Sequence, residues 1–154
     1  MAAVTRAARR TWAAESGAEL IEFAIALPIL LLVITGILDF AILFQRYEVV
    51  NNAAREGARV AVLPDFTVDD VKTRVKNYLN ASGLTATAPD PTVTYSTMSL
   101  GAGAPTVNVV KVVVQYPHQF VFIGPAMALV GAGSMADITL AASATMRTEA
   151  AAAP

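Results

Sequence analysis

The chain of 154 residues contains no cysteine, a single histidine and few charged side chains. Without cysteine, a disulfide framework, a thiolate metal site and a cysteine nucleophile are all excluded. Charged residues make up 15% of the chain, whereas soluble domains carry roughly 25%. Because 55% of the residues are hydrophobic, part of this excess is expected to lie in lipid. The net charge of −1 gives no basic surface for a nucleic acid, so no such partner is expected.

Side chains that could support catalysis are few and poorly grouped. His118 stands alone, and one imidazole cannot form a multi-histidine metal site. Asp65, Asp69 and Asp70 cluster where a helix is expected to begin, and carboxylates there complement the helix dipole. The two glycines of residues 100–105 lack the Lys-Ser/Thr of a phosphate-binding loop. We therefore predict a protein that is not an enzyme, with no catalytic residue, no metal and no cofactor.

A long apolar segment lies near the amino end. No charge occurs from Phe23 to Leu38, and the stretch from Leu20 to Phe44 exceeds the roughly 20 residues that span a ~30 Å hydrocarbon layer. The alternative is a core helix of a soluble domain, but the rest of the chain is too small to enclose it. Glu22 and Asp39 lie 17 positions apart, about 25 Å along a helix. Each carboxylate is therefore expected to reach one membrane interface.

The flanks of this segment indicate a retained anchor. Arg6, Arg9 and Arg10 precede it, which favours a cytoplasmic amino end, although three arginines also follow it closely. The apolar run is too long for a cleaved secretory signal. Inside it, Pro28 and Gly36 predict a local kink or unwinding. We expect one membrane span with the carboxy-terminal domain outside.

A seven-residue motif opens the apolar segment. Gly17-Ala-Glu-Leu-Ile-Glu22-Phe23 consists of a glycine, four residues and Glu-Phe. It resembles the processing site of prepilins of the Flp/Tad class, which a membrane aspartic prepilin peptidase cuts after the glycine. The resemblance implies that residues 1–17 form a cytoplasmic basic leader and that Ala18 becomes the mature amino terminus. The alternative is a loop glycine followed by an ordinary interfacial acid.

The spacing of the motif would also serve assembly. The new amine on Ala18 would lie one helical turn before Glu22, and residues four apart share a helix face. The amine could therefore neutralise the carboxylate within one subunit or between neighbours, which offsets the cost of burying both charges. Gly17 and Ala18 are thus the predicted processing residues, and Glu22 and Phe23 the predicted assembly residues.

A second motif follows the anchor. Asn51-Asn-Ala-Ala-Arg-Glu-Gly-Ala-Arg59 looks like a segment of TadE-like proteins, the minor pilins or pseudopilins of tight-adherence pilus systems. The ending from Ile138 to Glu149 is also similar. The resemblance covers residues 10–149 and is strongest over 17–59. Phe23 stands where the small major pilins often carry tyrosine, which, with the greater length of this chain, favours an accessory subunit.

The resemblance implies a minor pilin or pseudopilin of a Flp/Tad, type IVb-like pilus. Its N-terminal helix would pack to prime or join the filament. The implied partners are a prepilin peptidase, other pilins or pseudopilins and an inner-membrane platform. The implied location is the inner membrane, or the extracellular pilus after assembly. The alternative is a membrane-anchored accessory or adhesin-like protein of the same system that is not polymerised, since flat adhesive surfaces leave no motif.

The hydrophobic periodicity predicts an α+β, pilin-like fold. An anchor helix, 18–45, is expected to continue as a stalk helix, 46–63, ended by Pro64. Thr67 to Asp70 resembles a capping box that opens a second, short helix, which Gly83 ends. Three further segments are predicted to form a three-stranded, mostly antiparallel sheet: 92–98, 107–116 and 138–146. The head thus comprises residues 46–149, and a disordered tail, 150–154, is expected to follow.

Two features of the sheet region stand out. Six of the ten residues 107–116 are valines, which predicts a central strand covered on both faces. Residues 119–136 carry no charge, and their glycines and proline argue against a second spanning helix. This uncharged segment either folds under the domain or presents Phe120, Phe122 and Met127 as a candidate interface with another subunit or the bilayer.

Overall fold

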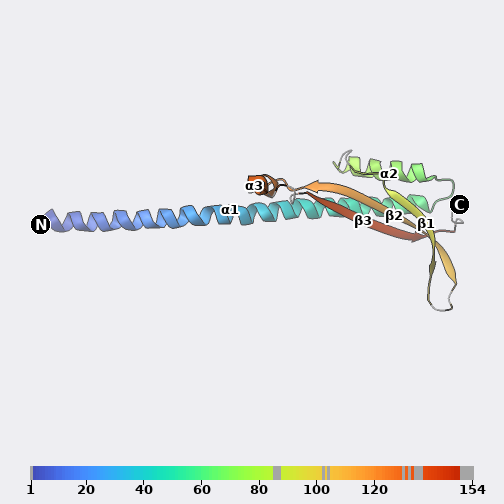
Figure 1. Cartoon of the computed structure of the whole chain (residues 1–154), viewed down its shortest axis with the longest axis horizontal. Coiled ribbons are helices and arrows are strands. Elements are labelled where there is room, and N and C mark those ends of the chain that lie inside the picture. The colour runs from blue at the N-terminus through green and yellow to red at the C-terminus, as the bar shows by residue number, and fades with distance from the viewer. Residues whose placement is uncertain are drawn as a thin grey trace.

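One long helix carries a head of helices and strands on its carboxy-terminal half, as Figure 1 shows. The computed structural model describes residues 2–84, 88–101, 103, 105–129, 131, 133 and 137–149, and only the backbone of 2–16, 126 and 129. The elements in chain order are α1 (Ala2–Ala61), α2 (Val68–Ala81), β1 (Thr92–Ser99), β2 (Thr106–Gln119), α3 (Ile123–Leu129) and β3 (Asp137–Arg147). This is the α+β arrangement that the sequence predicted. The expected tail, 150–154, lies outside the described residues.

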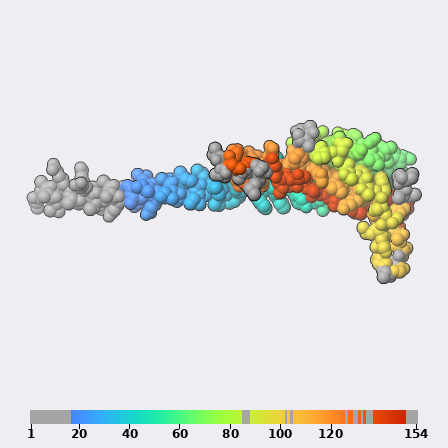
Figure 2. Space-filling view, in the orientation of Figure 1, coloured from blue at the N-terminus to red at the C-terminus, as the bar shows by residue number. Residues whose placement is uncertain are grey.

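Helix α1 continues through Pro28 and Gly36, where the sequence predicted a kink or unwinding. Proline removes one backbone hydrogen bond, yet the residues on both sides of it remain helical. The helix ends at Ala61, before Pro64 and two residues short of the predicted end of the stalk. Its 60 residues make a rod of about 90 Å at ~1.5 Å per residue. From residue 17 on, the part of α1 that precedes the head projects from it as a narrow rod (Figure 2).

Helix α2 begins with the predicted capping box. The Thr67 hydroxyl accepts a hydrogen bond from the Asp70 backbone N–H, and the Asp70 carboxylate accepts one from the Thr67 backbone N–H at 2.9 Å. The helix buries Val71, Val75 and Leu79. Gly83 follows its end with a φ of 78°, a conformation that glycine adopts without a steric penalty. The predicted start and stop of this helix are therefore both confirmed.

The three strands form one antiparallel sheet in the order β1-β2-β3. Strand β1 pairs only with 106–113, so the last part of β2 has β3 as its neighbour and is otherwise a sheet edge. Proline is tolerated at such edges, and Pro117 lies there. Strand β2 therefore extends through Gln119, three residues beyond the predicted strand.

The sheet is covered mainly on one face. The even-numbered residues of β2 from Val110 to His118 are buried, whereas Lys111, Gln115 and Pro117 on the other face are exposed. The prediction that β2 is covered on both faces is therefore wrong for most of the strand, although Val109 on the second face is also buried. Valines occupy both faces of this strand, so its composition did not reveal which face is buried.

The core lies between the inner face of the sheet and helices α1 and α2. Alanines on α1 are fully buried, and their small side chains allow the sheet and α2 to approach the helix closely. The main core residues are Val50, Ala53, Ala54, Ala58, Val71, Val75, Val110, Val112 and Val114. The carboxy-terminal part of α1 is therefore an integral part of the head as well as its stalk.

Candidate functional site

The amino-terminal half of α1 presents an apolar surface to its surroundings. Among the described residues, one helix is long and apolar enough to cross a membrane, and only 6% of its most apolar window is buried. Large side chains from Leu20 to Phe44 are mostly exposed. This exposure excludes the alternative of a core helix in a soluble domain, because the head does not enclose the segment. The surface requires lipid or apolar partners to cover it.

The predicted processing residues lie at the beginning of this surface. Gly17 is within α1, and a Cβ placed on it would meet no atom within 4 Å. Ala18, Glu22 and Phe23 are exposed on the helix that follows. Glu22 stands one helical turn after Ala18, as the predicted pairing requires. The motif is thus accessible from outside the chain and is not occupied in holding the head together.

Asp39 joins the anchor to the head, a role that the sequence did not indicate. Its carboxylate is 1% exposed and accepts hydrogen bonds from the backbone N–H groups of Val121, Phe122 and Ile123 at 2.7–3.1 Å. These are the residues at the start of α3, whose first N–H groups have no partner within the helix. We expected Asp39 to reach a membrane interface. That location stays a prediction, and the structure shows that the carboxylate is also satisfied within the chain, by a segment more than 80 positions away.

Helix α3 lies beside α1, past the end of the sheet that is nearer the amino terminus (Figure 1). Ile123 Cδ1 lies 3.6 Å from the position of a Cβ built on Gly36, so the Ile123 side chain lies against this point of α1. Between the two helices is a mostly apolar cavity of about 490 Å³, lined by Pro28, Leu31, Leu32, Thr35, Phe122, Ile123 and Met127. Two of the three candidate interface residues, Phe122 and Met127, therefore lie next to the anchor.

The third candidate, Phe120, packs at the junction of the head and the anchor. Its ring meets the His118 ring edge-to-face, with 5.3 Å between their centroids. His118 is 1% exposed, and its Nδ1 accepts a hydrogen bond from Arg46 Nη1 at 3.0 Å. Burial lowers the pKa of His118, and the Arg46 cation lowers it further. The imidazole is therefore neutral near pH 7, and it is not placed to take a proton from a substrate.

The Asn51–Arg59 motif marks the place where α1, α2 and β2 come together. A Cβ on Gly57 would lie 2.6 Å from Val75 Cγ2 in α2 and 3.1 Å from Val112 Cγ1 in β2. Ala53, Ala54 and Ala58 are fully buried around it. Small residues at these positions are what allow three elements to meet at one point. The motif therefore has a structural basis in packing the head onto its stalk.

Glu56 in the same motif links α1 to α2. Its carboxylate accepts hydrogen bonds from Arg59 on α1 at 2.8–2.9 Å and from Arg74 on α2 at 2.7–2.9 Å. The bonds from Arg59 and then from Arg74 lower its pKa to about 2. Glu56 is therefore ionised under all ordinary conditions and holds α2 in register on the stalk.

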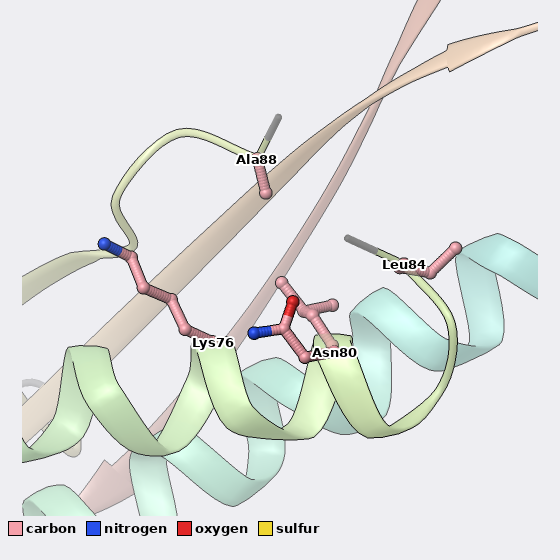
Figure 3. Close-up of a pocket in the computed structure, with 5 residues that line it drawn as sticks. Lys76, Asn80, Leu84 and Ala88 are labelled. Carbon is pink, nitrogen blue, oxygen red and sulfur yellow. The ribbon is translucent and has the colours of Figure 1, made fainter. Parts of the chain in front are cut away.

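A shallow hollow of the head lies beside α2. This hollow, drawn in Figure 3, has a volume of about 280 Å³ and is lined by Lys76, Leu79, Asn80, Leu84 and Ala88. Lys76 Nζ lies 2.6 Å from the Asp90 carboxylate, and the two side chains form a salt bridge. Within the described part of the chain, no three His, Cys, Asp or Glu residues are grouped as metal ligands. Of the acidic cluster, Asp70 serves as the α2 cap.

These features define a class of protein: an α+β head held by one apolar helix that fits a single-pass membrane anchor. Residues 17–59 match the sequence model of the family described as TadE-like protein. The predicted resemblance is therefore confirmed over this segment, which includes both motifs. The match indicates a Tad pilus-associated protein, and this is not a known family of enzymes. No curated protein and no solved structure matches the chain.

Proposed function

We propose that this protein is a minor pilin or pseudopilin of a Tad pilus system. A prepilin peptidase cuts it after Gly17, and it waits in the inner membrane with its head outside. It then joins or primes a filament through the exposed surface of α1. The observation that carries the proposal is the unburied apolar half of α1, which begins at the Gly17 motif and lies within the family match.

The residues around Gly17 are suited to a protease substrate. A peptidase must unwind the helix locally to reach the bond between Gly17 and Ala18. Glycine in a helix interior is about 0.5–1 kcal/mol less favourable than alanine, so unwinding is least costly there. No side chain at Gly17 blocks the approach to the backbone.

After cleavage, assembly would depend on the exposed surface of the anchor. Large apolar side chains cover it from Leu20 to Phe44, and the Glu22 carboxylate is its first charge. The Ala18 amine neutralises this carboxylate, which reduces the cost of transferring the helix into a bundle of neighbouring helices. The head is tied to α1 by Gly57 packing and by Glu56, so it follows the helix into the filament.

The test is the mature amino-terminal sequence of protein purified from a host with an active prepilin peptidase. We expect it to begin at Ala18, and the Gly17→Leu variant to remain uncut. The matched control is Ala13→Leu, which places the same side chain in the leader and should be cut normally. Wild-type protein that retains Met1 would exclude processing. Correct processing without recovery of the protein in purified pili would instead favour the anchored accessory role.

A further inference from the structure

The uncharged segment that contains α3 runs back along the anchor toward its amino end. Its first backbone N–H groups bind Asp39, Ile123 faces Gly36, and Met127 shares a cavity with Pro28 and Leu31. Figure 1 shows α3 beyond the end of the sheet, alongside α1. The contacts thus follow the anchor from residue 39 toward residue 28.

The depth of these contacts follows from the length of the anchor. Between Glu22 and Arg46 the only charge is that of Asp39, and this stretch covers about 36 Å of helix. Because a hydrocarbon layer is ~30 Å thick, nearly all of this stretch of helix lies within the layer. If the layer begins at Phe23, Pro28 and Gly36 lie about 8 Å and 20 Å inside it. The part of α1 that α3 contacts is therefore within the span.

The chemistry of the segment is compatible with lipid. Residues 119–136 contain no charged side chain. Val121 is 48% exposed and Phe122 45% exposed, so neither is covered by the protein's own head. Unpaired backbone N–H groups cost several kcal/mol in hydrocarbon. Asp39 accepts hydrogen bonds from three of those at the start of α3, and these bonds in turn satisfy the buried carboxylate.

We propose that residues 120–129 form a re-entrant segment that enters the bilayer from its outer side and is covered by lipid acyl chains. This proposal depends on the membrane anchor proposed above. Asp39 is the positioning residue of this segment. Its carboxylate accepts the hydrogen bonds of the N–H groups at the start of α3, at a depth where water is too scarce to accept them. Lipid is the occupant that the geometry favours, since the exposed side chains Val121 and Phe122 continue the apolar surface of the anchor itself.

The absence of cysteine makes site-specific labelling straightforward. Three single variants, Phe122→Cys, Leu30→Cys and Met98→Cys, replace side chains that are 45%, 53% and 48% exposed in the isolated chain. Met98→Cys reports the distal end of the head and corrects for the orientation of the protein in vesicles. Leu30→Cys reports the anchor. Each full-length variant is reconstituted at low density in phosphatidylcholine vesicles and treated with a membrane-impermeant maleimide.

We expect Phe122→Cys to react about ten times more slowly than Met98→Cys, because maleimide needs a thiolate in water. A bimane probe attached at Phe122→Cys in detergent should, after reconstitution, be quenched by lipids that carry a nitroxide on the acyl chain. Labelling of Phe122→Cys as fast as Met98→Cys, with Leu30→Cys protected, would overturn the re-entrant segment and leave the anchor intact. Labelling of all three would overturn the anchor as well. Protection of Phe122→Cys without acyl-chain quenching would mean a second protein copy, and would also overturn the proposal.

Discussion

A Cβ atom on Gly57 would lie 2.6 Å from Cγ2 of Val75, although the two residues belong to different helices. Carbon atoms attract one another only at about 3.5–4.0 Å, so any other residue would force α1 and α2 apart. On the other side, Val112 Cγ1 would be 3.1 Å away. Because Val75 and Val112 are both β-branched and fully buried, neither side chain can easily change its χ1 rotamer to make room.

The first prediction concerns Gly57→Ala. Overpacking costs typically 1–3 kcal/mol while alanine gains ~0.5–1 kcal/mol in a helix, so a net loss of roughly 1 kcal/mol in stability is expected. The four tyrosines all lie in the head, and their near-ultraviolet circular dichroism during thermal unfolding in detergent measures this loss. The control is Gly36→Ala, whose added Cβ would make an ordinary contact at 3.6 Å. Equal melting of the two variants would contradict the close packing.

A second prediction concerns acid sensitivity through Glu56. The hydrogen bonds from Arg59 and Arg74 lower its pKa from 4.5 to about 2 in the folded state. The stability that Glu56 contributes is therefore complete above pH 4.5 and is lost as the pH falls toward 2, because the unfolded chain takes up the proton first. Urea unfolding at a series of pH values should show a smaller acid loss in Glu56→Gln. Arg74→Gln, which removes one of the two cations, should be intermediate. An unchanged pH dependence in Glu56→Gln would exclude this link.

The third prediction separates assembly from insertion. Glu22→Ala removes the carboxylate that the Ala18 amine is proposed to neutralise, so it should be cleaved and inserted normally but should not enter or support pili. Electron microscopy and immunoblotting of sheared pili measure the effect. Glu19→Ala is the matched control, since it removes another exposed carboxylate of the same motif. If both variants behave like wild type, Glu22 is an ordinary surface acid.

Orientation gives a fourth prediction. The arginines of the leader favour a cytoplasmic amino end, which places the head and Pro154 on the other side. Alkaline phosphatase fused after Pro154 should therefore be active, whereas a reporter that works only in the cytoplasm should be silent at the same junction. The opposite pattern of activity would overturn the topology and the pilin function together.

Features set by neighbouring residues could be predicted from the sequence. The capping box of α2 involves Thr67 and Asp70, three positions apart, and both its bonds are present. The strands follow from short β-branched runs separated by turn residues, and their order follows because consecutive strands usually pair. These signals are local, so no knowledge of the tertiary structure was needed to read them.

The contacts of Asp39 and Glu56 could not be predicted because they join distant parts of the chain. Asp39 binds residues more than 80 positions away. The sequence around a single carboxylate in an apolar run does not indicate which residues that carboxylate binds. The signal in retrospect is the pairing of a lone buried acid with an uncharged segment elsewhere that begins a helix. Gly57 was part of a recognised motif, but only the packing of Val75 and Val112 gives its reason.

The head contacts α1 from Gly36 to Ala61, and the helix is unbroken below it. The head therefore has no hinge about which to pivot, and its orientation depends on the rotation of the anchor about its own axis. A helix turns by about 100° per residue. A shift of one residue in the packing register between neighbouring anchors would therefore rotate the β1–β2 hairpin by about a quarter of a turn around the helix axis. Changes among the exposed apolar residues of the anchor would thus decide which way the β1–β2 hairpin points.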